Sequence, residues 1–114
     1  MKLSEVQKLL DCEVLTDNLH PEVEIKDVVA SDGMSEILAF TKSGELMVTG
    51  LTNIQSIRTA DVAGVCAVIY CRGKRPQQNV IDYANSKGIP VLATKMVMFD
   101  VCGILYKAGL KGVS

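Results

Sequence analysis

The chain has 114 residues, of which 48% are hydrophobic and 22% charged, and its formal net charge is -1. This size and composition predict one globular domain over residues 1–114 that needs no disulfide to support its core. The nearly balanced charge excludes a global field for holding nucleic acid or an anionic membrane surface. The N-terminus has no apolar signal region, and no apolar run reaches the roughly 18 to 20 residues of a membrane span, so a cytoplasmic protein is expected.

Helices and strands are expected to alternate along the chain. Apolar spacing predicts helices over 3–10, 34–42, 54–63, 76–87 and 96–108, strands over 12–16, 23–30, 45–49, 65–71 and 89–93, and a loop over 17–21. Pro76 is placed to open the fourth helix and Gly88 to end it. This alternation predicts an α/β fold, a three-layer α/β/α sandwich with a mostly parallel sheet of about five strands.

The run from Val65 to Cys71 is the expected central strand. Its seven residues carry no charge and include β-branched side chains, which is typical of a strand buried on both faces of a parallel sheet. The basic turn Arg72-Gly73-Lys74-Arg75 follows it directly. Three cations in four residues facing a helix N-terminus oppose the helix dipole, and a bound anion would relieve this local repulsion.

A binding site is expected where parallel strands end, because ligands of such sheets bind beyond the carboxyl ends of the strands. Four turns should meet at that edge and supply glycines, hydroxyls and cations suited to a nucleotide or another anionic metabolite. The alternative is structural, because the same residue types serve as turn and capping residues. The candidate ligand-binding residues are Ser31, Asp32, Thr49, Gly50, Thr52, Asn53, Arg72, Gly73, Lys74, Arg75, Thr94 and Lys95.

Catalytic and metal-binding motifs find little support. The cysteines at positions 12, 66, 71 and 102 form no Cys-x-x-Cys pair, so buried free thiols are expected, with a redox or cluster-binding role as the alternative. The one histidine, His20, precedes a proline in a polar segment typical of a surface loop. The basic turn lacks the upstream glycine and the Ser or Thr of a phosphate-binding P-loop. We therefore expect no enzyme, no metal site and no cofactor.

Several separated segments together resemble one known family. They are Val48 to Asn53, Ile57 to Ala60, Arg72 to Pro76, Gly88 to Thr94 and Met98 to Asp100, and they span nearly the whole chain. The pattern resembles the DRTGG domain family, which is similar to the N-terminal domain of HPr kinase/phosphorylase and occurs alone or attached to phosphotransacetylases and CBS-domain pyrophosphatases. The resemblance implies an α/β/α fold, homodimers, and a regulatory or ligand-sensing role without catalytic residues.

The chain departs from the family name at two places. The Asp-Arg pair aligns with Leu51-Thr52, and the Gly-Gly pair with Arg72-Gly73, so the resemblance carries over no role for the Asp-Arg pair. The resulting expectation is a non-enzymatic regulatory module that binds an anionic metabolite or nucleotide at the carboxyl edge of the sheet. A protein-interaction domain without a small-molecule site is the main alternative, and phosphotransfer or hydrolysis of a phosphorylated substrate is a third.

Overall fold

The computed structural model describes residues 1–17 and 20–112. The expected loop over 17–21 includes residues 18 and 19, which lie outside the described residues. Within the described part, helices and strands follow one another as α1 (Leu3–Leu9), β1 (Glu13–Val14), β2 (Asp27–Ala30), α2 (Met34–Phe40), β3 (Leu46–Thr49), α3 (Ile54–Ala63), β4 (Ala67–Tyr70), α4 (Gln78–Lys87), β5 (Val91–Ala93), α5 (Met98–Lys107) and β6 (Lys111–Gly112). None of the helices in this part has the length and apolar character of a membrane span.

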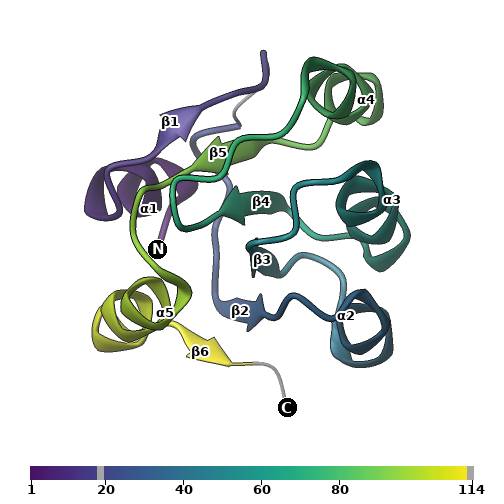
Figure 1. Cartoon of the computed structure of the whole chain (residues 1–114). Helices are drawn as coiled ribbons and strands as arrows, with labels where there is room; N and C mark the ends of the chain where they lie inside the picture. The colour runs from purple at the N-terminus through teal and green to yellow at the C-terminus, as the bar shows by residue number, and fades with distance from the viewer. Residues whose placement is uncertain (18–19, 113–114) are drawn as a thin grey trace.

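The described strands form one sheet of six strands in the order β1-β5-β4-β3-β2-β6 (Figure 1). β1 runs antiparallel to β5, and all the other neighbours are parallel. The expected α/β fold with a mostly parallel sheet is confirmed, and the sheet has one more strand than the expected five. The additional strand is β6, which pairs with β2 through only two positions.

Helices cover both faces of the sheet, so the three expected layers are present. Figure 1 shows α1 and α5 on one face and α2, α3 and α4 on the other. The strands alternate between these layers: Leu46 and Val48 of β3 pack in the cluster under α1 and α5, and Met47 packs in the cluster under α2, α3 and α4. Side chains of a strand point alternately to its two faces, so an uninterrupted apolar run supplies both cores.

The central position of the strand predicted from the uncharged run is confirmed. β4 lies between β3 and β5, and each of its residues is buried. Ala67 and Ile69 face the α1 and α5 layer, and Val68 and Tyr70 face the opposite layer. β4 therefore connects the two cores through the middle of the sheet.

The strand expected over 23–30 is half as long as predicted. Only Asp27–Ala30 joins the sheet as β2. The residues before it pair with the N-terminus instead: the N–H of Leu3 donates to the carbonyl of Val23 at 3.0 Å, and Lys2 forms an antiparallel bridge with Glu24. Apolar alternation is the same for both pairings, so it does not reveal which strand is the partner.

Four helices differ from their predicted bounds, and α3 keeps them. α1 ends at Leu9 rather than residue 10, α2 ends at Phe40 rather than residue 42, and α5 spans Met98–Lys107 rather than 96–108. α4 begins at Gln78 rather than Pro76, because Gln77 stays extended as its N-cap with φ -68° and ψ 161°. In α3, Val62 is 77% exposed, whereas the small residues Thr59 and Ala60 are buried. Gly88 ends α4 in the left-handed conformation at φ 68°, as predicted for a C-cap.

Candidate functional site at the carboxyl edge of the sheet

Four turns meet at the edge where β2, β3, β4 and β5 end. These strands are mutually parallel, so the segments 31–33, 49–53, 72–75 and 94–95 that follow them lie along one side of the sheet. This is the placement expected from the sequence. Whether the residues bind a ligand is a separate question, which depends on the partners that each side chain already has.

Asp32 links three of the turns. Its Oδ1 accepts hydrogen bonds from the backbone N–H of Gly50 at 2.7 Å and from the hydroxyl of Thr49 at 3.2 Å. Its Oδ2 lies 3.9 Å from Nη2 of Arg72, and about half of each of these two charged side chains is exposed. An exposed ion pair of this kind contributes about 0 to 1 kcal/mol. The carboxylate nevertheless holds the N–H and stands near the guanidinium that an incoming anion would use.

Three other candidate residues make internal hydrogen bonds. The hydroxyl of Ser31 accepts from the N–H of Gly33 at 2.9 Å. Asn53 caps α3, its side-chain oxygen accepting from the N–H of Ser56 at 3.3 Å. The hydroxyl of Thr94, which is 3% exposed, donates to the carbonyl of Leu10 at 2.7 Å. These contacts support the structural alternative for Ser31, Asn53 and Thr94. Thr52 is half-buried.

The capped end of α3 is anchored to the central strand. The hydroxyl of Ser56 donates to the carbonyl of Asn53 at 2.7 Å and lies 2.6 Å from the phenol oxygen of Tyr70. Tyr70 is fully buried, and this burial raises the pKa of its phenol to about 12. The hydrogen bond between the Ser56 and Tyr70 side chains therefore anchors the turn between β3 and α3 to β4.

The chain leaves β4 and β5 toward opposite faces of the sheet. α4 packs in the same layer as α2 and α3, whereas α5 packs with α1 (Figure 1). Divergence of this kind opens a crevice between the two strand ends, and ligands of open α/β sheets bind at such switch points. By this rule the preferred position for a ligand is between the turns 72–75 and 94–95.

Two backbone hydrogen bonds connect these diverging turns. Arg72 and Gly73 both adopt left-handed conformations, with φ 64° and 70°. In this conformation the N–H of Arg72 donates to the carbonyl of Met96 at 2.7 Å, and the N–H of Gly73 donates to the carbonyl of Thr94 at 2.9 Å. The inner part of the crevice is thus closed by the protein's own backbone.

A hollow of about 300 Å³ remains beside these bonds. Four of the predicted site residues line it, and the other five lining residues come from the segment 10–13 and from β5 and the turn after it. The lining residues are Leu10, Asp11, Glu13, Gly73, Arg75, Ala93, Thr94, Lys95 and Met96. The volume matches the lower end of small-molecule sites.

The charges around this hollow are mixed. Nη1 of Arg75 lies 2.7 Å from Oε1 of Glu13, and this hydrogen bond lowers the pKa of Glu13 below its ordinary value. Lys95 lines the hollow with an exposed side chain, and Lys74 is exposed in the neighbouring turn. The sequence interpretation missed Asp11 and Glu13, because β1 joins the sheet antiparallel and so its first residues come to the edge where the other strands end.

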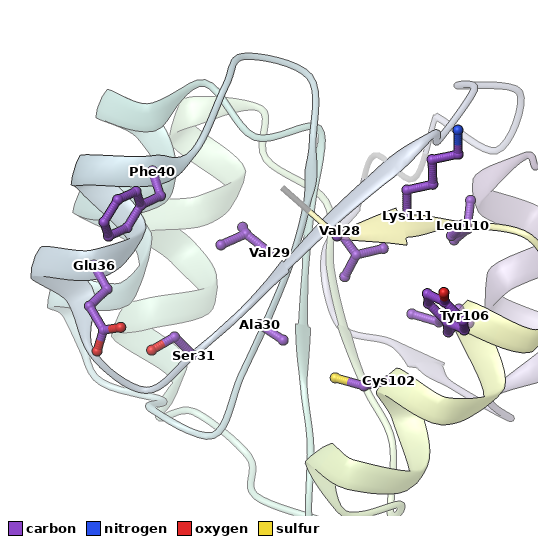
Figure 2. A pocket seen from close by; sticks show the side chains of 12 residues that line it. Val28, Val29, Ala30, Ser31, Glu36, Phe40, Cys102, Tyr106, Leu110 and Lys111 are labelled. Atoms are coloured by element: carbon purple, nitrogen blue, oxygen red, sulfur yellow. The ribbon is translucent and has the colours of Figure 1, made fainter. Parts of the chain in front are cut away.

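A larger groove lies along β2, toward the end of the strand order formed by β2 and β6. It has a volume of about 610 Å³ and is mainly apolar. Figure 2 shows Glu36 and Phe40 of α2 on one side of β2, and Cys102 and Tyr106 of α5 on the other. Of the candidate site residues only Ser31 lines it. The groove runs along β2 directly beyond the two positions that pair with β6.

Burial disfavours the thiolate form of all four cysteines. Burial raises the pKa of Cys12 to about 12 and that of Cys66 to about 11, and it also raises the pKa values of Cys71 and Cys102. All four cysteines are free thiols. Among the residues that the structure describes, no cluster of three or more His, Cys, Asp or Glu side chains could hold a metal ion.

Comparison with known proteins places this geometry in a family. No curated protein sequence matches the chain. Among solved structures, the chain is similar to the CBS and DRTGG domains of the regulatory region of Clostridium perfringens pyrophosphatase, crystallised with its activator diadenosine tetraphosphate, with a TM-score of 0.73 and 17% sequence identity. The match covers 91% of this chain and 45% of that chain, so this chain spans less than half of that structure. The model of the DRTGG domain matches residues 5–108, and the chain therefore belongs to the DRTGG domain family.

Proposed function

We propose that this chain is a non-enzymatic regulatory module that binds a nucleotide or another anionic metabolite at the carboxyl edge of its sheet. The observation that carries the proposal is the hollow of about 300 Å³ at the point where the chain diverges after β4 and β5. Lys95 in its wall and Lys74 beside it are exposed cations suited to phosphate oxygens. Of the candidate residues, Gly73, Arg75 and Thr94 also line this hollow.

The structural relative supports a nucleotide as the ligand class. That structure belongs to the regulatory region of an enzyme and was solved with diadenosine tetraphosphate as activator. It contains CBS domains as well as a DRTGG domain, so binding by this chain alone is what needs to be measured. The similarity to the N-terminal domain of HPr kinase/phosphorylase, a single domain over 1–114 and a cytoplasmic location are further parts of this proposal.

Calorimetric titration of the isolated chain tests the ligand. ATP, diadenosine tetraphosphate, pyrophosphate and acetyl phosphate are titrated into wild type and into a variant with Lys74→Glu and Lys95→Glu. Each charge-assisted contact to phosphate contributes about 1.5 to 3 kcal/mol, so the double variant should lose binding by at least about 100-fold. A control with Lys42→Glu and Arg58→Glu makes the same charge change at exposed positions away from this edge and should bind as wild type does.

Two results would overturn this assignment. One is the absence of heat with every ligand at concentrations up to about 1 mM. A dissociation constant of about 1 mM corresponds to a binding free energy of about -4.1 kcal/mol. The other is equal weakening by the edge variant and by the control, which would show a nonspecific effect of net charge.

A second candidate function is a protein-interaction domain, including association of two copies as a homodimer. The groove around β2 favours it, because Phe40 and Tyr106 line this apolar surface while 64% and 76% exposed. Sedimentation velocity of wild type and of a variant with Phe40→Glu and Tyr106→Glu distinguishes the states of association. A monomeric wild type would contradict a homodimer. Capture of a partner to the same extent by wild type, the groove variant and the edge variant would contradict the docking role.

A further inference from the structure

The first turns of α5 expose an apolar surface beside the candidate site. Phe99 is 85% exposed and Val97 is 45% exposed. A second, shallow hollow of about 430 Å³ lies here, lined by Met96, Phe99, Asp100, Gly103 and Ile104. An exposed phenylalanine alone needs no explanation, since apolar side chains are scattered over all protein surfaces. Its position next to the anion site is what gives it significance.

Met96 connects this surface to the candidate anion site. It lines both the hollow of about 300 Å³ beside Lys95 and the hollow of about 430 Å³ beside Phe99. Its backbone is held in place, since its carbonyl accepts from the N–H of Arg72 at 2.7 Å and its N–H donates to the hydroxyl of Thr94 at 3.3 Å. The two hollows are therefore neighbours across one fixed residue.

The chemistry of the two hollows is complementary to the two ends of a nucleotide. One has mixed charges, with Lys95 as an exposed cation, Arg75 paired with Glu13, and Asp11 as a further carboxylate. The other offers an aromatic ring, two aliphatic side chains and one carboxylate. Resting on the function proposed above, we infer that the base of the bound nucleotide stacks on Phe99 while its phosphates lie at Lys95. Asp100 accepts a hydrogen bond from the amino group of the base, which selects a base that carries an exocyclic amine.

Gly103 is a position at which a substitution can block this subsite. A Cβ atom built at Gly103 meets no atom within 4 Å, so a larger side chain there extends into open space. Gly103→Leu should fill the hollow in which the base would lie without disturbing the packing of α5, whose buried residues are Val101 and Leu105. Phe99→Ala removes the stacking surface, and the high exposure of Phe99 makes a loss of folding from this change small.

The test compares a ligand that has a base with one that has none. ATP and inorganic tripolyphosphate are titrated into wild type, Phe99→Ala, Gly103→Leu and the control Tyr106→Ala, which removes an exposed aromatic ring from the same helix outside both hollows. Stacking on an aromatic side chain predicts that Phe99→Ala weakens ATP by about 5-fold to 150-fold and leaves tripolyphosphate unchanged. Gly103→Leu should do the same, and Tyr106→Ala should change neither ligand.

The role of Asp100 is measured with inosine triphosphate, whose base lacks the amino group. Wild type should bind ATP about 10-fold more tightly than inosine triphosphate, and Asp100→Ala should abolish the difference. Equal binding of the two nucleotides by wild type would overturn the hydrogen bond to Asp100.

The failure of this inference is distinct from the failure of the proposed function. If tripolyphosphate and ATP bind with equal affinity and both lose it in the variant with Lys74→Glu and Lys95→Glu, the anion site stands and the base subsite is wrong. If Phe99→Ala weakens both ligands equally, the subsite is also wrong, because the effect does not depend on the base. If neither ligand binds wild type, the proposed function and the subsite are both overturned.

Discussion

The buried hydrogen bond between Ser56 and Tyr70 makes an asymmetric prediction about stability. The single hydroxyl hydrogen of Ser56 is donated to the carbonyl of Asn53 at 2.7 Å, so the phenol of Tyr70 must be the donor in the 2.6 Å contact between the two side chains. Tyr70→Phe removes this donor and leaves the bond from Ser56 to Asn53 intact. Ser56→Ala instead leaves a phenol hydrogen without an acceptor at a fully buried position.

The two substitutions should therefore differ in cost. Loss of an ordinary hydrogen bond costs about 0.5 to 1.5 kcal/mol, whereas a buried donor left unsatisfied costs about 1 to 3 kcal/mol. Ser56→Ala should lower the free energy of unfolding by about 1 kcal/mol more than Tyr70→Phe. The double variant should be less destabilised than the sum of the single variants, since Tyr70→Phe also removes the unsatisfied group.

The same pair predicts a loss of stability at high pH. Burial raises the pKa of Tyr70 from 10.0 to about 12, so folding favours the neutral phenol. Its contribution is complete below pH 10 and is lost as the pH rises toward 12, by about 2 to 3 kcal/mol in total. Tyr70→Phe lacks this contribution, so the difference in stability between wild type and the variant should shrink or reverse over this interval.

Urea denaturation followed by circular dichroism at pH 7 and between pH 9.5 and about 12 measures these quantities. A larger cost for Tyr70→Phe than for Ser56→Ala at pH 7, or additive costs in the double variant, would contradict a donor role of the Tyr70 phenol. A difference between wild type and Tyr70→Phe that is independent of pH in the alkaline range would contradict the raised pKa of Tyr70.

Three further outcomes are expected. Asp32→Asn keeps an acceptor for the N–H of Gly50 but removes a negative charge from the edge. The affinity for tripolyphosphate should therefore rise by about 5-fold at low salt. An unchanged or lower affinity would contradict competition between the carboxylate and the anion. Gly64→Ala should lower the melting temperature, because Gly64 ends α3 in the left-handed conformation at φ 73°. Gly103→Ala should raise the melting temperature, because it replaces a helical glycine at a position with open space around it. Effects of the same sign would be inconsistent with these backbone conformations. Burial raises the pKa of Cys12 to about 12, so only about 1 in 10,000 Cys12 thiols of the folded protein should be thiolate at pH 8. Cys12 should therefore react far more slowly with iodoacetamide in the folded protein than in the protein unfolded by urea. Peptide mass spectrometry measures the two rates.

The parts of the fold that the sequence predicts are those where local pattern and tertiary partner agree. The uncharged and β-branched run around β4 favours a strand buried on both faces, and the structure shows this strand. β6 could not be found in this way, because a lysine and a glycine have no strand pattern and pair with β2 only after α5 has returned the chain to that edge. The first half of the run over 23–30 failed for a related reason, since its partner is the N-terminal segment before α1.

The candidate site shows the same limit for charges. Three cations in one short turn suggested an anion site, but sequence spacing does not show that Arg72 lies near Asp32 or that Arg75 binds Glu13. These partners are 40 and 62 positions away along the chain and come together only through the order of the strands. The placement of the four turns at one edge follows from the parallel sheet, and it was predictable because it requires only the strand directions.

The two shortest strands, β1 and β6, also bear on how the edges of the sheet pair with other molecules. They lie at the two ends of the described sheet and carry Glu13 and Lys111, whereas β3, β4 and β5 between them have no charged residue. Long, flat and uncharged strands at a sheet edge readily pair with other molecules and aggregate. A two-residue strand with a charge offers few backbone groups for such pairing, so β1 and β6 are poor templates for assembly of sheets edge to edge.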